Sequence, residues 1–105
     1  MRRATYRRGL RLSEAEVERR LRPLRNWRRT GKRIYRVVKL EGFTDGVRLL
    51  RRIAEIADEM NHHPDVSLGY GRMRISLTTH DEGGLTDRDF KLARRIERLL
   101  RSRGL

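Results

Sequence analysis

Apolar residues recur with two different periods along the second half of the chain. Between residues 44 and 60 they return every three or four positions, which is the period of a helix buried on one side. This predicted buried face consists of Val47, Leu50, Ala54, Ala57 and Met60. Between residues 66 and 77 they alternate with polar ones, as in a strand with one buried face. These strand positions are Val66, Leu68, Tyr70, Met73, Ile75 and Leu77. The pattern predicts a long helix and then a hairpin that turns at Gly71-Arg72.

The first third of the chain predicts a short helix followed by another hairpin. The segment "SEAE" begins at Ser13 and is a capping box, with Glu16 three residues after the cap. The apolar face of this helix is Val17, Leu21 and Leu24, and Pro23 limits its length. In "NWRRTGKRIYRVVKL", residues 30–32 form the turn between two strands.

The C-terminal segment predicts a last helix. Thr86 and Asp89 form a second capping box after a Gly-Gly loop, with an apolar face behind them. That face consists of Phe90, Ala93, Ile96, Leu99 and Leu100. The element order is therefore α-β-β-α-β-β-α, which favours an α+β fold: a four-stranded antiparallel sheet with helices packed on one face. We expect one domain over residues 1–105, with a flexible basic arm at residues 1–9. The bare sheet face and the edge strands are natural places to oligomerise.

The charge of the chain is concentrated at its start. The formal net charge is +13, and residues 1–33 hold 13 Lys or Arg against 3 Asp or Glu. Such a segment could meet phosphate groups, or it could be a solvated, salt-bridged surface. No zinc-ligand spacing or Gly-aromatic RNA-binding motif accompanies it, so the sequence does not favour nucleic acid as a partner. No apolar run approaches membrane-spanning length, and no cysteine is present. We expect no signal peptide, because the basic residues at 1–13 are not followed by an apolar segment. We expect a cytoplasmic protein without a membrane segment.

The three histidines fall at predicted element ends. Two are adjacent in "DEMNHHPDV", and His80 follows the last strand in "LTTHDEGGLTDRD". Because Pro64 forces an extended conformation on His63, the rings of His62 and His63 should diverge. The hairpin between them returns His80 to the same end of the molecule, so all three imidazoles could share one pocket rimmed by acidic residues. Imidazole gives and takes protons near neutral pH, which indicates acid–base chemistry.

Other interpretations of the same residues stay open. A histidine at a helix C-terminus can simply stabilise the helix dipole. A metal site built from all three histidines is a sharper alternative, although the adjacent pair suits it poorly. Asp89 could be only a capping residue. We expect Trp27 in the core.

These two segments resemble the signature of the pterin-4a-carbinolamine dehydratase family. The resemblance covers about residues 10 to 100, and its spacing matches without gaps. The matching positions are Asp58, His62-His63-Pro64, Tyr70, Thr79-His80-Asp81, Gly84-Leu85-Thr86 and Asp89. One departure is Val66, where the family often carries an aromatic residue.

The resemblance implies dehydration of 4a-hydroxytetrahydropterin to quinonoid dihydropterin, without a metal or organic cofactor. It implies that His62 and His63 transfer protons and that His80 assists departure of the hydroxyl. The implied substrate-binding residues are Asn61, Thr78, Thr79, Asp81 and Asp89. It also implies a homodimer or homotetramer. The alternatives are a non-catalytic pterin-binding accessory protein, or a dimerisation module that binds protein or nucleic acid.

Overall fold

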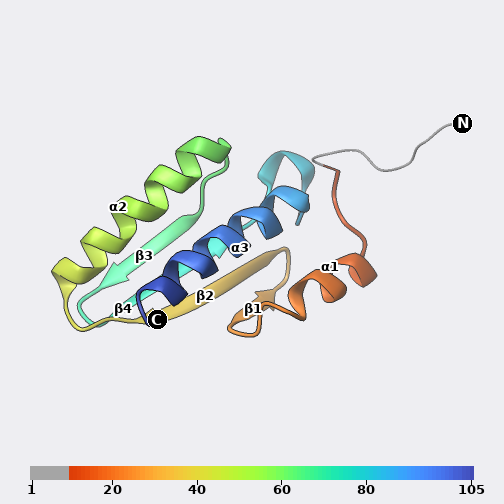
Figure 1. The fold of residues 1–105 in the computed structure, drawn as a ribbon. Helices are drawn as coiled ribbons and strands as arrows, with labels where there is room; N and C mark the ends of the chain where they lie inside the picture. Colours follow the sequence, from red (N-terminus) through yellow and green to blue (C-terminus); the bar gives the residue numbers. More distant parts are fainter. Residues whose placement is uncertain (1–9) are drawn as a thin grey trace, which may run out of the picture.

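The computed structural model describes residues 10–105, so the predicted basic arm at residues 1–9 lies outside the described part. The helices are α1 (Glu14–Leu21), α2 (Phe43–Met60) and α3 (Asp87–Ser102), with a short 3-10 helix, η1 (His80–Glu82). The strands are β1 (Trp27–Thr30), β2 (Arg33–Lys39), β3 (Asp65–Gly69) and β4 (Arg72–Leu77). This order confirms the predicted one, with η1 as an addition (Figure 1).

The four strands form one antiparallel sheet in the order β1-β2-β4-β3. The long middle pair, β2 and β4, joins the two hairpins. In the second hairpin Gly69 pairs with Arg72, so the turn is at Tyr70-Gly71 and the predicted turn is wrong by one residue. Tyr70 therefore stands at the tip of the hairpin, with 75% of its surface exposed.

The helices cover one face of the sheet and share a single core with it. Figure 1 shows α3 running along the sheet, with α2 and α1 to either side. Ile34 and Ile75 of the sheet are fully buried against Val17, Ile53 and residues of α3. The predicted layer architecture is therefore confirmed. None of the helices in residues 10–105 is long and apolar enough to cross a membrane.

The buried face of α2 differs from the predicted one. Its buried residues are Gly46, Leu49, Ile53, Ile56 and Ala57. Val47, by contrast, is 46% exposed, and Ala54 is also exposed. The helix carries two adjacent apolar stripes, and the one with the larger aliphatic side chains lies on the sheet. The close approach of α2 to β3 favours the same stripe. A Cβ on Gly46 would lie 2.4 Å from a methyl carbon of Leu68, so any larger residue at this contact would force the Leu68 side chain to shift.

Local capping signals correctly located the ends of two helices. The Ser13 hydroxyl accepts a hydrogen bond from the Glu16 backbone N–H, as predicted for the start of α1. At the start of α3, both halves of the predicted capping box between Thr86 and Asp89 are present. The second half matters most here, because it fixes the position of the Asp89 carboxylate.

Trp27 lies in the core, as predicted, beside a buried ion pair. Its indole N–H donates to Glu97 of α3 over 2.9 Å, and Glu97 also accepts from Arg36 of β2 over 3.0 Å. Burial raises the pKa of Glu97, but the hydrogen bonds from Arg36 and Trp27 outweigh it and hold that pKa below its ordinary value. This ion pair ties α3 to the first hairpin.

Candidate functional site

The end of α2 sets the directions of the adjacent histidines. Asn61 has a left-handed backbone conformation with a φ of 51°, which asparagine tolerates better than most residues. The His62 N–H then bonds back to the Ala57 carbonyl over 3.1 Å. The chain therefore reverses at Asn61 and directs His62 towards the start of α3.

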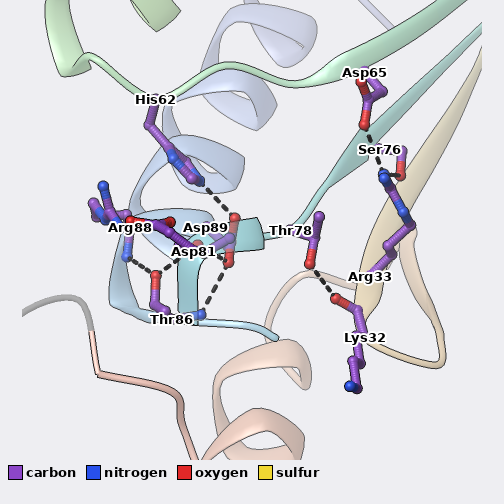
Figure 2. Close-up of polar contacts among 11 residues, drawn as sticks. Lys32, Arg33, His62, Asp65, Ser76, Thr78, Asp81, Thr86, Arg88 and Asp89 are labelled. Atoms are coloured by element: carbon purple, nitrogen blue, oxygen red, sulfur yellow. Dashed lines mark hydrogen bonds and ion pairs between the residues drawn. The ribbon is translucent and has the colours of Figure 1, made fainter. Parts of the chain in front are cut away.

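His62 is buried and contacts the capping residue of α3. Its Nε2 lies 2.6 Å from Oδ1 of Asp89, and only 8% of its side chain is exposed. The other carboxylate oxygen, Oδ2, accepts from the Thr86 backbone N–H over 2.9 Å and from the Thr79 hydroxyl over 2.8 Å. Figure 2 shows the His62 ring pointing at Asp89, which stands between the ring and Thr86. Asp89 is thus both a capping residue, as predicted, and a partner of His62.

The Asp89 contact favours one protonation pattern in His62. The buried Asp89 carboxylate already accepts hydrogen bonds from the Thr86 N–H and the Thr79 hydroxyl, and the His62 tautomer that carries its proton on Nε2 would give it a third donor. Nδ1 then keeps its lone pair when the ring is neutral. The ring is fixed in orientation and has one nitrogen free for chemistry.

His63 has the opposite surroundings. Its Nε2 lies 2.8 Å from Oδ1 of Asp58, in the last turn of α2, and 56% of its side chain is exposed. The two neighbouring rings therefore have different partners on different elements, in agreement with the predicted divergence.

His80 approaches the same region from β4. It opens η1 and is exposed. The residue before it, Thr79, forms a bridge with Gly84 and bonds to Asp89, which in turn bonds to His62. The backbone at His80 is thus tied to the His62 network, although no hydrogen bond joins the His80 ring to it within residues 10–105. His62, Thr79 and Asp89 form one connected cluster.

The remaining predicted residues surround this cluster at different depths. Asn61 is exposed at the end of α2. Asp81 is exposed and lies 3.8 Å from the guanidinium of Arg88. The Thr78 hydroxyl donates to the Lys32 carbonyl over 2.6 Å (Figure 2), whereas the Thr79 hydroxyl donates to Asp89. Thr78 and Thr79 therefore point to different sides of the strand end, and only Thr79 joins the His62 cluster.

Two residues that matched the family signature, but received no site role from the sequence, contact the predicted site residues. The Thr86 hydroxyl lies 2.9 Å from that of Thr79, so it supports the Asp89 carboxylate from within the cap. Asp58 orients His63. The signal for Asp58 was available, because its spacing before the adjacent histidines is part of the family signature.

The start of α3 is anchored by a further carboxylate. Asp87 is paired with Arg20 of α1 and, over 3.2 Å, with Lys91. Burial raises the pKa of Asp87, but hydrogen bonds from Arg20 and Lys91 outweigh it, so the net pKa is lower than usual. The pairing of Asp87 holds the first turn of α3, and with it Asp89, in place.

A metal ion requires several ligating side chains gathered around one point. Within residues 10–105, no cluster of three or more His, Cys, Asp or Glu side chains has the arrangement of a metal site.

A cavity of about 410 Å³ lies between α1 and the Gly83-Gly84 loop. It is lined by Arg11, Arg29 and Lys32, among others, and by no histidine.

Comparisons with known proteins agree on one family. The family model described as "Pterin 4 alpha carbinolamine dehydratase" matches residues 10–99. A Sulfolobus acidocaldarius protein named "Putative pterin-4-alpha-carbinolamine dehydratase" is 39% identical over 86% of this chain and 99% of that protein. A protein of the same name from Metallosphaera sedula is 42% identical over 85% of this chain and 93% of that protein.

Solved structures share the fold. A Brucella melitensis protein described as a "transcriptional coactivator/pterin dehydratase" superposes with a TM-score of 0.80 and 32% identity, covering 85% of this chain and 97% of that one. A "pterin dehydratase-like protein" described as a RuBisCO assembly factor of the alpha-carboxysome has a TM-score of 0.59 and 21% identity, over 70% of this chain and 88% of that one. That second likeness concerns the fold alone. The family match and the curated relatives show that this chain belongs to the pterin-4-alpha-carbinolamine dehydratase family.

Proposed function

We propose that the protein dehydrates 4a-hydroxytetrahydropterin to quinonoid dihydropterin by general acid–base catalysis. The observation that carries the proposal is the pair of imidazole–carboxylate contacts at the end of α2, one buried (His62 with Asp89) and one exposed (His63 with Asp58). Family membership supports the substrate class.

The reaction needs one proton donor and one proton acceptor. The C4a–O bond breaks, and the departing hydroxyl takes a proton from the acid to leave as water. The base removes the N5 proton, and the electron pair left on nitrogen completes the C4a=N5 double bond. Atoms and charge balance without a metal, a redox partner or a covalent intermediate. Imidazole suits both roles because its pKa lies near neutral pH.

We assign the proton transfers to the histidines as a group. His62 and His63 act on either side of C4a, and His80 holds the pterin and assists departure of the hydroxyl. Asn61, Thr78, Thr79 and Asp81 line the substrate, in this proposal, while Asp89 positions His62. Fixing the imidazole before substrate arrives lowers the cost of reaching the transition state.

The proposal includes a cytoplasmic homodimer or homotetramer. The second apolar stripe of α2 supports self-association, because it leaves Phe43 48% and Val47 46% exposed. Charge along the helix supports an antiparallel pairing of two copies: the first half is rich in arginine and the second half carries Glu55, Asp58 and Glu59. Light scattering after size exclusion measures the mass directly.

A stopped-flow assay tests the activity. Carbinolamine generated in the flow cell loses water spontaneously, so the protein must accelerate that background rate in proportion to its concentration. We expect His80→Ala to lower the acceleration at least tenfold, within the usual contribution of a general acid or base. Arg25→Ala is the matched control, because Arg25 is exposed and lies in the loop between α1 and β1. Loss of activity in neither variant, or equal loss in both, would refute the assignment.

A further inference from the structure

The face of the sheet that the helices leave open is strongly basic. Side chains alternate between the two faces of a strand, so the neighbours of the core residues in β2 and β4 point away from the helices. The charged residues on this open face are the cations Arg28, Arg33, Lys39, Arg72 and Arg74, and the carboxylate Asp65. Five cations stand against one carboxylate on this surface.

Most of these cations are not neutralised by the fold. Arg33 is paired with Asp65 over 2.8 Å. Arg28, Lys39 and Arg72 are exposed and form no ion pair within residues 10–105. Lys39 lies directly opposite Arg72 in the register of β2 and β4, so their charges repel each other across the sheet. An anionic ligand would relieve that repulsion.

An aromatic platform lies among the cations. The Arg74 guanidinium stacks over the Tyr35 ring, 3.9 Å from its centroid. Tyr35 belongs to β2, a middle strand, and it pairs with Arg28 of the neighbouring strand β1. Planar groups of this kind stack with nucleic-acid bases, while nearby cations contact the phosphates.

Charge decides between the candidate occupants. A second copy of the same face would bring ten cations together against two carboxylates, so self-association through it is disfavoured. A polyanion is complementary. The half-buried Tyr35–Arg74 stack adds a preference for flat, unpaired bases over the side chains of an acidic protein.

We propose that the open sheet face, defined by Arg28, Tyr35, Lys39, Arg72 and Arg74, binds single-stranded nucleic acid. The sequence did not favour this partner, because no nucleic-acid-binding motif accompanies its basic residues. The sheet gathers residues from three strands onto one surface, which the sequence pattern alone did not reveal. The inference is independent of the dehydratase proposal.

Fluorescence anisotropy with a labelled 20-nucleotide RNA of mixed sequence tests it. We expect a dissociation constant on the order of 1–100 μM at 50 mM KCl, weakening steeply as salt rises. The double variant Lys39→Ala/Arg72→Ala should bind about tenfold more weakly. Its slope of log affinity against log salt should be shallower by roughly 1.4, since each phosphate contact on a single strand contributes roughly 0.7.

The matched control removes the same charge from the opposite side of the molecule. Arg94 and Arg98 are exposed on α3, and Arg94→Ala/Arg98→Ala lowers the net charge equally. It should bind within about twofold of the wild type. Tyr35→Leu should lose about fivefold or more, because stacking on a base is lost. Circular dichroism and the urea midpoint report whether each variant keeps its fold.

Three results would overturn the proposal. Equal weakening in the two double variants would mean that net charge alone binds the RNA. Unchanged binding by Tyr35→Leu, together with equal affinity for a 20-base-pair duplex, would remove the single-strand preference. Competition by poly-glutamate as strong as that by unlabelled RNA, at equal charge, would identify an acidic-protein surface instead.

Discussion

His62 and His63 are neighbours in the chain but differ in almost every physical respect. His62 is buried and hydrogen-bonded to a carboxylate that also caps α3, whereas His63 is half-exposed and paired with an exposed carboxylate of its own helix. The first contact therefore belongs to the fold as well as to the proposed chemistry. The second can be removed with little structural consequence. The comparison separates residues that position the site from residues that are free to act in it.

The largest effect is expected from removing the shared carboxylate. Asp89→Ala deletes the N-cap contact and leaves the Thr86 N–H and the Thr79 hydroxyl without their buried acceptor. A lost cap costs about 1 kcal/mol, and each orphaned buried donor roughly 1–3 kcal/mol. We expect urea unfolding to show a loss of about 2–4 kcal/mol, with dehydration reduced strongly even in the folded fraction. Stability within about 0.5 kcal/mol of wild type would contradict the dual role of Asp89.

Alanine substitutions at the two neighbouring histidines test the comparison directly. His63→Ala should slow dehydration at least tenfold with an unchanged urea midpoint, because its ring has only an exposed partner. His62→Ala should slow the reaction and also lower stability, because it removes a buried donor from Asp89. Identical stability of the two variants would erase the distinction.

A smaller effect is expected from Asp58→Asn. The amide keeps the size of the side chain but removes the charge that orients His63, so the rate should fall by about two- to tenfold without a change in stability. Stopped-flow rates and urea midpoints of the variant measure both quantities. A wild-type rate in Asp58→Asn would show that the contact with Asp58 does not orient His63 for the reaction.

The smallest effect is expected for the unfolding free energy at acid pH, to which the carboxylates of Glu97 and Asp87 contribute. Glu97 and Asp87 have lowered pKa values in the folded protein, so each contributes stability that is present above its ordinary pKa and is lost as the pH falls below it. The unfolding free energy should therefore decline below about pH 4.5, starting near the ordinary value for Glu97. In Glu97→Gln the decline should be shallower. A decline of the same slope in that variant would show that other groups control it.

The fold was predictable where the signals are local. The caps at Ser13 and Thr86 and both hairpins follow from residues within a few positions of each other. The buried face of α2 was not predictable from the sequence. Two apolar stripes lie side by side on this helix, and the close packing of Gly46 against Leu68, which distinguishes them, is a contact between distant residues.

The sequence predicted the divergence of the adjacent histidine rings but not how deeply either ring is buried. The spacing of His62, His80 and Asp89 indicated which residues to consider. It did not indicate that His62 would be buried, because burial depends on a contact between residues 27 positions apart. The sequence also did not show that the Thr86 hydroxyl contacts the Thr79 hydroxyl beside Asp89. The capping-box sequence is the same whether or not the cap hydroxyl has a partner outside the helix. The basic sheet face was missed for a related reason, because strand pairing brings its arginines together.

The dehydration rate of a His63→Ala/His80→Ala double variant, measured by stopped flow beside the wild type, tests the central claim most directly. Both rings are exposed, so the variant should stay folded. We predict that the wild type accelerates loss of water from 4a-hydroxytetrahydropterin and that the double variant falls to near the spontaneous rate. A folded double variant that keeps the wild-type rate would contradict histidine catalysis at this site.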